Sequence, residues 1–192
     1  MLKTCLDHEI YIPNLCYMDM LEHPPASCRL CFVEIEGRHQ PVPSCQVEVV
    51  ENMVVKTDTP AVRQLQQTAL ELLLSVHHVD CGHCPANKKC ELQKIARFLK
   101  VGLKPKRLET FLKDQETMGD HFFLNHHPNR CVLCGKCIQV CRKTHGVPMM
   151  DFADRGFKTV IRFYGTQKPD AVSCEQCLAC VEICPVGAIT LK

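Results

Sequence analysis

The sequence CVLCGKCIQVC at residues 131–141 decides the fold, because the same pattern returns as CEQCLACVEIC at residues 174–184. Both segments have the spacing C-x2-C-x2-C-x3-C, and the residue before the last cysteine is apolar in each, Val140 or Ile183. Repetition of a whole motif indicates an internal duplication. We therefore expect a module of two similar halves with two similar sites.

This spacing is typical of bacterial ferredoxins with two 4Fe-4S clusters, in which the fourth cysteine of each motif ligates the other cluster. The rule assigns one cluster to Cys131, Cys134, Cys137 and Cys184, and the other to Cys141, Cys174, Cys177 and Cys180. Cys184 is followed by the proline usual at this place, whereas Cys141 is followed by Arg142. Zinc also binds four thiolates, but its sites usually combine two C-x2-C pairs.

A second group of four cysteines lies near the start of the chain with the spacing C-x11-C-x2-C-x13-C. Its members are Cys16, Cys28, Cys31 and Cys45. The plant-type 2Fe-2S pattern is C-x4-C-x2-C with a distant fourth cysteine, so the first interval here is longer. Residues 32–36, 42–50 and 53–57 are rich in branched side chains and predict strands. A loop followed by strands suits a 2Fe-2S cluster, and a zinc site is the alternative.

A third group has only three cysteines, Cys81, Cys84 and Cys90. A 4Fe-4S cluster needs a fourth ligand, and the candidates in the sequence are Cys5, His77, His78 and His83. His77 gives the arrangement H-x3-C-x2-C-x5-C at the end of a predicted helix, so we favour it. Cys5 is then most simply a small buried apolar residue on a short opening helix.

The segments between the cysteines predict an α+β fold with three modules. Residues 1–58 form a truncated, plant-type 2Fe-2S ferredoxin-like domain, and residues 59–100 a small helical domain with one histidine and three cysteines. In the latter we expect an amphipathic helix at 60–76, preceded by the cap residue Thr59, and another at 88–100. Residues 101–126 are a connecting segment with a helix near 108–115. Residues 127–192 form the two-cluster 4Fe-4S ferredoxin domain.

The composition narrows the function. Sixteen cysteines among 192 residues, without a secretion signal at the start, favour metal-bound thiolates in the cytoplasm over disulfides. No apolar run approaches the roughly 18–20 residues of a membrane span, and a net charge of +2 does not indicate nucleic-acid binding. We find no GxGxxG motif, no P-loop and no set of catalytic side chains. The chain is therefore expected to have no catalytic centre besides its redox clusters.

The order of the sites, together with YIPNLCY at 11–17, CRLCFVEIEG at 28–37, HHVDCGHCPANKKCELQ at 77–93 and RGFKTVI at 155–161, resembles a known region. It is similar to the electron-input iron–sulfur region shared by FeFe hydrogenases, the large cluster-bearing subunit of respiratory complex I, the diaphorase small subunit of NAD-linked hydrogenases, and related formate dehydrogenases. The resemblance runs from about Tyr11 to Ile189.

This resemblance implies a subunit of a cytoplasmic NAD(P)-linked oxidoreductase of the hydrogenase, formate dehydrogenase or electron-bifurcating type. One 2Fe-2S and three 4Fe-4S clusters would pass single electrons between a flavin-containing NAD(P)H-oxidising subunit, accompanied by a further 2Fe-2S subunit, and a catalytic subunit or soluble ferredoxin. FMN and NAD(P) are expected in partner subunits only. The family's opening β-hairpin and catalytic domain are absent from this sequence. The alternatives are a free-standing multi-cluster ferredoxin-like carrier and a zinc-stabilised structural module.

Overall fold

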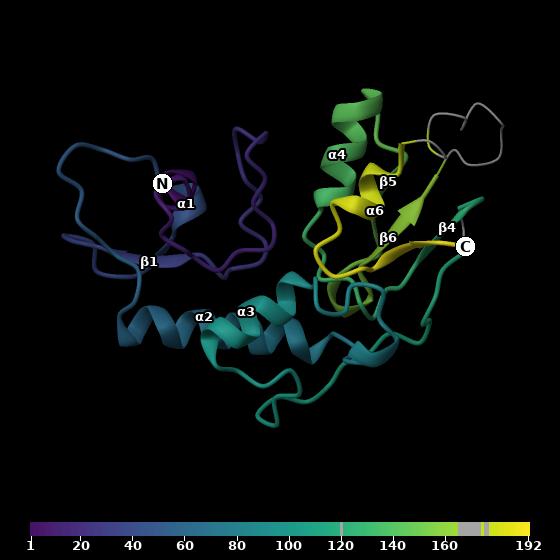
Figure 1. The fold of residues 1–192 in the computed structure, drawn as a ribbon, viewed down its shortest axis with the longest axis horizontal. Coiled ribbons are helices and arrows are strands. Elements are labelled where there is room, and N and C mark those ends of the chain that lie inside the picture. The colour runs from purple at the N-terminus through teal and green to yellow at the C-terminus, as the bar shows by residue number, and fades with distance from the viewer. Residues whose placement is uncertain (120, 165–173, 175–176) are drawn as a thin grey trace.

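The structure, a computed structural model, describes residues 1–119, 121–164, 174 and 177–192. Figure 1 shows the N-terminal segment on one side, two helices across the base, and the C-terminal helices and strands on the other side. This arrangement confirms the expected mixture of helix and strand. Glu175 and Gln176, which belong to the second copy of the repeated motif, lie outside the described residues.

The N-terminal part consists of helix α1 (Leu2–Asp7) and a small antiparallel sheet in the order β2-β1-β3. The central strand β1 is Phe32–Ile35, and its neighbours are β2 (Val42–Pro43) and β3 (Val55–Lys56). The predicted strand at 32–36 is confirmed, but the one at 42–50 is wrong beyond Pro43, and the one at 53–57 shortens to two residues. Proline cannot donate to the strand ladder. The chain turns there into the 3-10 helix η1 (Ser44–Gln46), whose Ser44 N donates to the Cys31 carbonyl at 2.8 Å.

Helix α2 (Pro60–Ser75) matches the prediction for residues 60–76. Its first turn is capped by Thr59, whose hydroxyl accepts a hydrogen bond from Val62 N at 3.2 Å, and Pro60 occupies the first helical position. Helix α3 (Glu91–Leu99) begins later than predicted, because Lys88 has φ +66° and Cys90 is extended. A short 3-10 helix η2 (Cys81–His83) lies between the two.

The connecting segment differs from the prediction. Residues 108–115, all of which the structure describes, contain no helix. Their polar groups bond instead to other elements: Phe111 N donates to the Ser75 carbonyl at 2.8 Å, and the amide of Lys113 donates to Asn129 Oδ1 at 2.7 Å. Just before them, Arg107 Nε donates to Glu71 of α2 at 2.8 Å. These bonds hold the segment against the end of α2, which local sequence preference cannot reveal.

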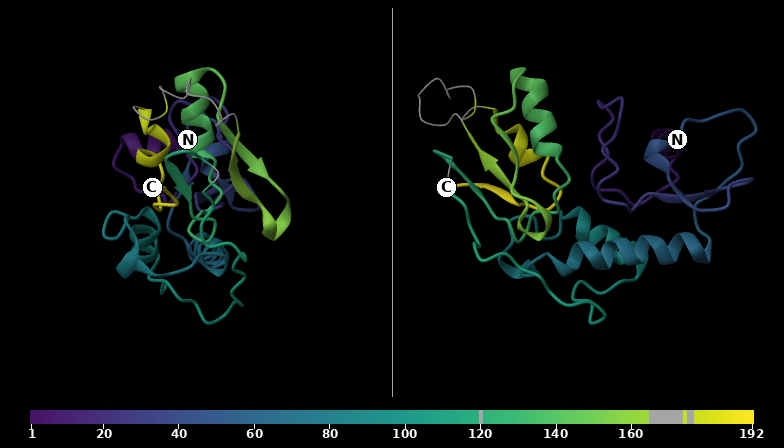
Figure 2. Two further views of the ribbon diagram at one scale, coloured as in Figure 1. Left: turned by 90° about the vertical axis from the view of Figure 1, so that its right-hand side faces the viewer. Right: turned by 180° about the vertical axis from the view of Figure 1, so that it is seen from behind.

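The described residues of the C-terminal part form two antiparallel strand pairs and two helices that pack together. Figure 2 shows them from two further sides. The elements are β4 (Leu124–His126) with β7 (Ile189–Leu191), β5 (Met150–Ala153) with β6 (Val160–Phe163), the 3-10 helix η3 (Gly156–Lys158), α4 (Lys136–His145) and α6 (Ala179–Glu182). The residue after the second cysteine of each motif, Gly135 or Leu178, has positive φ and caps the helix that follows. The two halves thus repeat one local structure, although α6 is shorter.

One buried core joins all three parts of the chain. Leu70 and Leu74 of α2 and Ile95 of α3 pack there against residues from both ends of the sequence. The remaining buried members are Leu15, Cys16, Cys28, Leu30, Ala69, Cys90, Leu92, Ala96, Leu99, Val132, Val186 and Ala188. Because apolar burial is the main stabilising term in folding, we expect the three parts to fold as one body. Among the described residues, no helix is both long and apolar enough to cross a membrane.

A close contact between two parts of this body can be tested at Gly187. Its φ is +64°, and an added Cβ would lie 2.9 Å from the Cβ of Ala86 in the central part. Gly156 also has positive φ, +60°, but an added Cβ there meets nothing within 4 Å. The two glycines therefore share the backbone strain and differ in the close approach.

We predict that Gly187→Ala destabilises the loaded protein more than Gly156→Ala does. The strain of a left-handed alanine costs roughly 1 kcal/mol at both positions. Overpacking adds roughly 1–3 kcal/mol at Gly187 only. Each kcal/mol should lower Tm by about 2–4 °C for a chain of this size, measured by circular dichroism. Equal losses in the two variants would contradict the tight contact between these loops.

Candidate functional site

The four N-terminal cysteines come together at the start of the small sheet. Cys16 Sγ lies 3.4 Å from Cys28 Sγ, and Cys31 and Cys45 are hydrogen-bonded to each other. The turn that presents them includes Arg29, whose φ of +54° is unusual for a side chain of this size. A hydrogen bond from Cys28 lowers the pKa of Cys16 to about 5, and the pKa of Cys28 is raised. Four thiols of this first set therefore share one small space.

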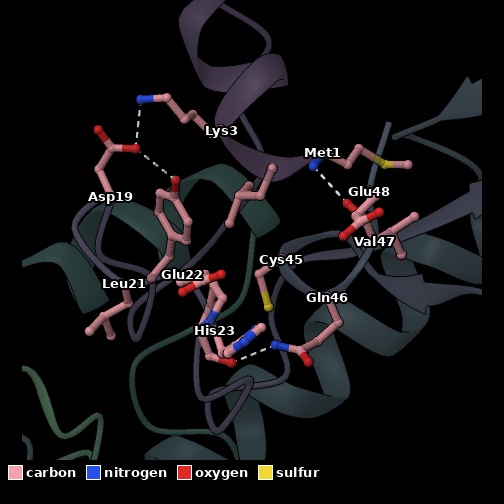
Figure 3. A pocket seen from close by; sticks show the side chains of 13 residues that line it. Met1, Lys3, Asp19, Leu21, Glu22, His23, Cys45, Gln46, Val47 and Glu48 are labelled. Atoms are coloured by element: carbon pink, nitrogen blue, oxygen red, sulfur yellow. Dashed lines mark hydrogen bonds and ion pairs between the residues drawn. The ribbon is translucent and has the colours of Figure 1, made fainter. Parts of the chain in front are cut away.

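Cys45 is the most accessible cysteine of this set. The other three are buried, whereas Cys45 is half-buried and lines an open cavity of about 300 Å³. Figure 3 shows its sulfur among Gln46, Glu22 and His23, with the Lys3–Asp19 ion pair at one side. Anything held by these four thiols is closest to solvent on this side.

The eight cysteines of the duplicated motifs line two separate small cavities, each of about 20 Å³. The first is lined by Cys131, Cys134, Cys137 and Cys184, and the second by Cys141, Cys174, Cys177 and Cys180. In each case three cysteines come from one motif and the fourth from the other: Cys141 lies in α4, and Cys184 follows the end of α6. The structure thus brings together the two sets that the sequence predicted.

These thiols are held where a negative charge is unfavourable. Burial raises the pKa of Cys131 to about 12 and that of Cys134 to about 11. The pKa of Cys137 is raised well above its usual value, first by burial and then by the cysteines around it. In the second cavity burial raises the pKa of Cys180 to about 12. Several thiolates can coexist at such a place only around a positive charge, which an iron–sulfur core supplies.

The third group of cysteines also comes together, beside the first cavity. Burial, followed by the charges of Cys84 and Cys81, raises the pKa of Cys90. Cys84 Sγ lies 3.9 Å from the carbonyl oxygen of Val186, and Glu91 N donates to the Pro185 carbonyl at 3.0 Å. The structure therefore packs this group against the loop that follows Cys184.

His77 differs from the other candidates for the missing ligand. Burial lowers its pKa to about 4, so the ring is neutral at pH 7, and its backbone partner is Arg130. Its Nδ1 is buried and has no hydrogen-bond partner among the described residues, Cys81, Cys84 and Cys90 included. An unpaired buried nitrogen of a neutral imidazole fits a metal ligand. The structure gives no contact between this ring and the three cysteines.

The other candidates for the fourth ligand of the third group lie in less suitable surroundings. His78 is exposed, and the exposed ring of His83 pairs with Asp80 at 2.9 Å. Cys5 packs in the core of the N-terminal part, together with Cys31 and Cys45, rather than in the core that contains Cys90. Across the described residues, no three His, Cys, Asp or Glu side chains converge on a position for a single metal ion.

Neighbouring sets lie close enough to affect one another electrostatically. The charge of Cys16 from the first set contributes to the raised pKa of Cys134, and that of Cys180 contributes to the pKa of Cys137. Packing agrees with these effects, because cysteines of the first set and the first cavity share one buried core, and cysteines of the two cavities share another. Together with the packing of Cys84 on Val186, they make the four groups one contiguous arrangement.

Two histidines that the cysteine motifs do not predict also line the cavities. His126 of β4 borders the first cavity and His121 the second, and both are almost completely buried. A usable signal was the segment from His121 to His127, which contains three of the ten histidines of the chain. Because this segment is distant in sequence from the cysteines that it adjoins, the cysteine motifs do not indicate that its histidines line the cavities.

Three protein-family models match the chain in succession. Residues 1–60 match a 2Fe-2S iron-sulfur cluster binding domain, and residues 66–103 match the NADH-ubiquinone oxidoreductase-G iron-sulfur binding region. Residues 122–190 match the ferredoxin-like domain of NADH-quinone oxidoreductase subunit 3. Iron–sulfur domains of both the 2Fe-2S and the 4Fe-4S kind are thus indicated along the chain.

Curated relatives agree with these models. The chain is 34% identical to a G subunit of the NADH-quinone oxidoreductase of Rhizobium meliloti (strain 1021), over 94% of this chain and 21% of that protein. It is also 34% identical to the NADP-reducing hydrogenase subunit HndD of Solidesulfovibrio fructosivorans, over 94% of this chain and 31% of that protein. The chain therefore spans between a fifth and a third of the length of these relatives.

A solved structure has the same fold. The chain aligns over its whole length with 80% of a chain in the crystal structure of the NAD+-reducing [NiFe]-hydrogenase in the H2-reduced state, with a TM-score of 0.82 and 26% identity. The resemblance predicted from the cysteine motifs is confirmed. The chain carries the iron–sulfur region that G subunits of NADH-quinone oxidoreductases share with subunits of NAD(P)-linked hydrogenases.

Proposed function

We propose that the chain transfers single electrons through one 2Fe-2S and three 4Fe-4S clusters within a multisubunit NAD(P)-linked oxidoreductase. The observation that carries this proposal is that three of the four cysteine groups share one buried core, while the fourth shares a second core with Cys131 and Cys137 of the first cavity. Iron–sulfur clusters supply one-electron oxidation and reduction, and they exchange electrons when they lie near one another. The chain's own residues hold the clusters, bury them and fix their neighbours.

The proposed ligands are the residues predicted from the sequence. The 2Fe-2S cluster is assigned to the first set, and two 4Fe-4S clusters are assigned to the two cavities, each with one cysteine from the other motif. The remaining 4Fe-4S cluster is assigned to Cys81, Cys84, Cys90 and His77. For His77 the support is its neutral ring and the unpaired Nδ1, together with the less suitable surroundings of the other candidates.

The neighbours of each set suggest an order for transfer. The first set adjoins the first cavity through Cys16 and Cys134, and the first cavity adjoins the second through Cys137 and Cys180. The third group contacts the loop after Cys184 and so adjoins the first cavity as well. We infer a line of three clusters with the histidine-ligated one beside its middle member.

The proposed partner subunits are inferred from the names of the similar proteins. Their names specify NADH-quinone oxidoreductase, NADP-reducing hydrogenase and NAD+-reducing hydrogenase. We propose that a flavin-containing NAD(P)H-oxidising subunit, with a further 2Fe-2S subunit, contacts one end of the line, and a catalytic subunit or soluble ferredoxin the other. The half-buried Cys45 makes the N-terminal set one accessible end.

We predict that the chain, prepared and reconstituted without oxygen, binds about fourteen irons, the sum for one two-iron and three four-iron clusters. Iron and acid-labile sulfide should be measured by chemical analysis, and zinc by mass spectrometry. Zinc at the four-thiolate sites with a colourless product would support the structural module instead. An iron content near ten in a fully loaded sample would remove one four-iron cluster from the assignment.

We predict that His77→Ala perturbs one 4Fe-4S signal and leaves the other clusters intact, because alanine cannot replace the imidazole nitrogen. His78→Ala is the matched control, since this neighbouring histidine is exposed. Low-temperature EPR of the reduced variants checks both. Unchanged spectra for His77→Ala, or a lost signal for His78→Ala, would place the fourth ligand elsewhere.

A further inference from the structure

His121 is a buried histidine in the wall of the second cavity. Only 2% of its surface is exposed, and it lines the cavity together with Cys141, Cys174, Cys177 and Cys180. It belongs to the segment that leads into β4, far in sequence from all four cysteines. Apart from the cysteines, the only other titratable side chain known in this wall, within the described residues, is His145, which is half-buried at the end of α4.

The orientation of the His121 ring follows from its contacts. Its Nδ1 accepts a hydrogen bond from Phe123 N at 3.4 Å, which puts the proton of the neutral ring on Nε2. Phe123 and Phe163 pack edge-on against the ring, with centroid distances of 4.6 and 4.9 Å. Burial, and then the charge of Lys192, lower the pKa of His121, so the neutral form predominates at pH 7. The ring is therefore a fixed N–H donor.

Such a donor has a definite effect on an iron–sulfur cluster. The cluster and its thiolates gain a negative charge on reduction, and hydrogen bonds to the sulfurs stabilise that charge, which raises the reduction potential. The effect is larger in a dry, apolar site than in water. Apart from the cysteines and the half-buried His145, the described residues of this wall, such as Leu124 and Phe163, are apolar, so none of their side chains is a competing donor of similar burial.

We propose that His121 raises the reduction potential of the 4Fe-4S cluster held by Cys141, Cys174, Cys177 and Cys180, by donating Nε2–H toward its sulfurs. The inference rests on the proposed function, because it requires a cluster in this cavity. In this role His121 adjusts the reduction potential of the cluster and is not one of its ligands. The potential of the second cluster relative to the first would then be set in part by a residue outside the cysteine motifs.

The test compares three variants of the full chain by EPR-monitored redox titration. His121→Leu removes the donor and keeps an apolar side chain. His121→Gln keeps an N–H donor. Phe123→Leu keeps the backbone amide that orients the histidine and removes only one ring contact. Iron content is measured on every sample, so that loss of the cluster is not mistaken for a shift in its potential.

We expect His121→Leu to reduce the equilibrium constant for one-electron reduction of one 4Fe-4S cluster by several-fold to tenfold, and tenfold corresponds to ~59 mV. The other clusters should keep their potentials, His121→Gln should restore most of the change, and Phe123→Leu should have little effect. The proposal is overturned if His121→Leu keeps its iron and leaves the reduction potential of every cluster unchanged. It is also overturned if His121→Gln or Phe123→Leu shifts the potential of the same cluster as much as His121→Leu does. Absence of iron from this cavity in the unsubstituted chain would instead refute the proposed function.

Discussion

The rest of the structure depends on one electrostatic constraint: thiols that are crowded and buried cannot all lose their protons without a positive charge among them. Burial raises the pKa of Cys131, Cys134 and Cys180, and the pKa of Cys137 rises further because other cysteines surround it. A cluster core removes this penalty by binding the thiolates. Binding of the metal and folding of these segments are therefore expected to be coupled, with the short strands and helices supplying the frame.

The frame holds the cysteine groups in one body. Helices α2 and α3 lie beneath both ends of the chain, and their leucines and isoleucine form a core with residues beside three of the four groups. Aromatic contacts add to this attachment: Arg63 of α2 stacks on Phe98 of α3 at 4.3 Å, and Tyr11 of the N-terminal part packs edge-on against the same ring at 4.7 Å. Fixed distances between clusters require such rigid contacts, because electron transfer depends on separation.

The sequence predicted the parts that local patterns encode. The cysteine spacing indicated all the groups that the structure brings together, and the cap and periodicity at Thr59 and Pro60 located α2. The predicted secondary structure is wrong where contacts between residues distant in sequence determine the local conformation. The segment around Phe111 bonds to the end of α2 instead of forming a helix, and the chain after Pro43 turns toward Cys31 instead of continuing as a strand. His121 and His126 could not be assigned to the cavities, because only the packing of β4 brings them there.

We propose that the N-terminal cluster and the cluster of the first cavity are close neighbours within one rigid chain. Magnetic interaction between two reduced clusters tests this most directly, because it depends steeply on their separation. The EPR signal of the 2Fe-2S cluster should be recorded with the neighbouring 4Fe-4S cluster oxidised and then reduced. We predict faster relaxation and broadening of the 2Fe-2S signal when its neighbour is reduced. A 2Fe-2S signal that is identical in both states would contradict the claim.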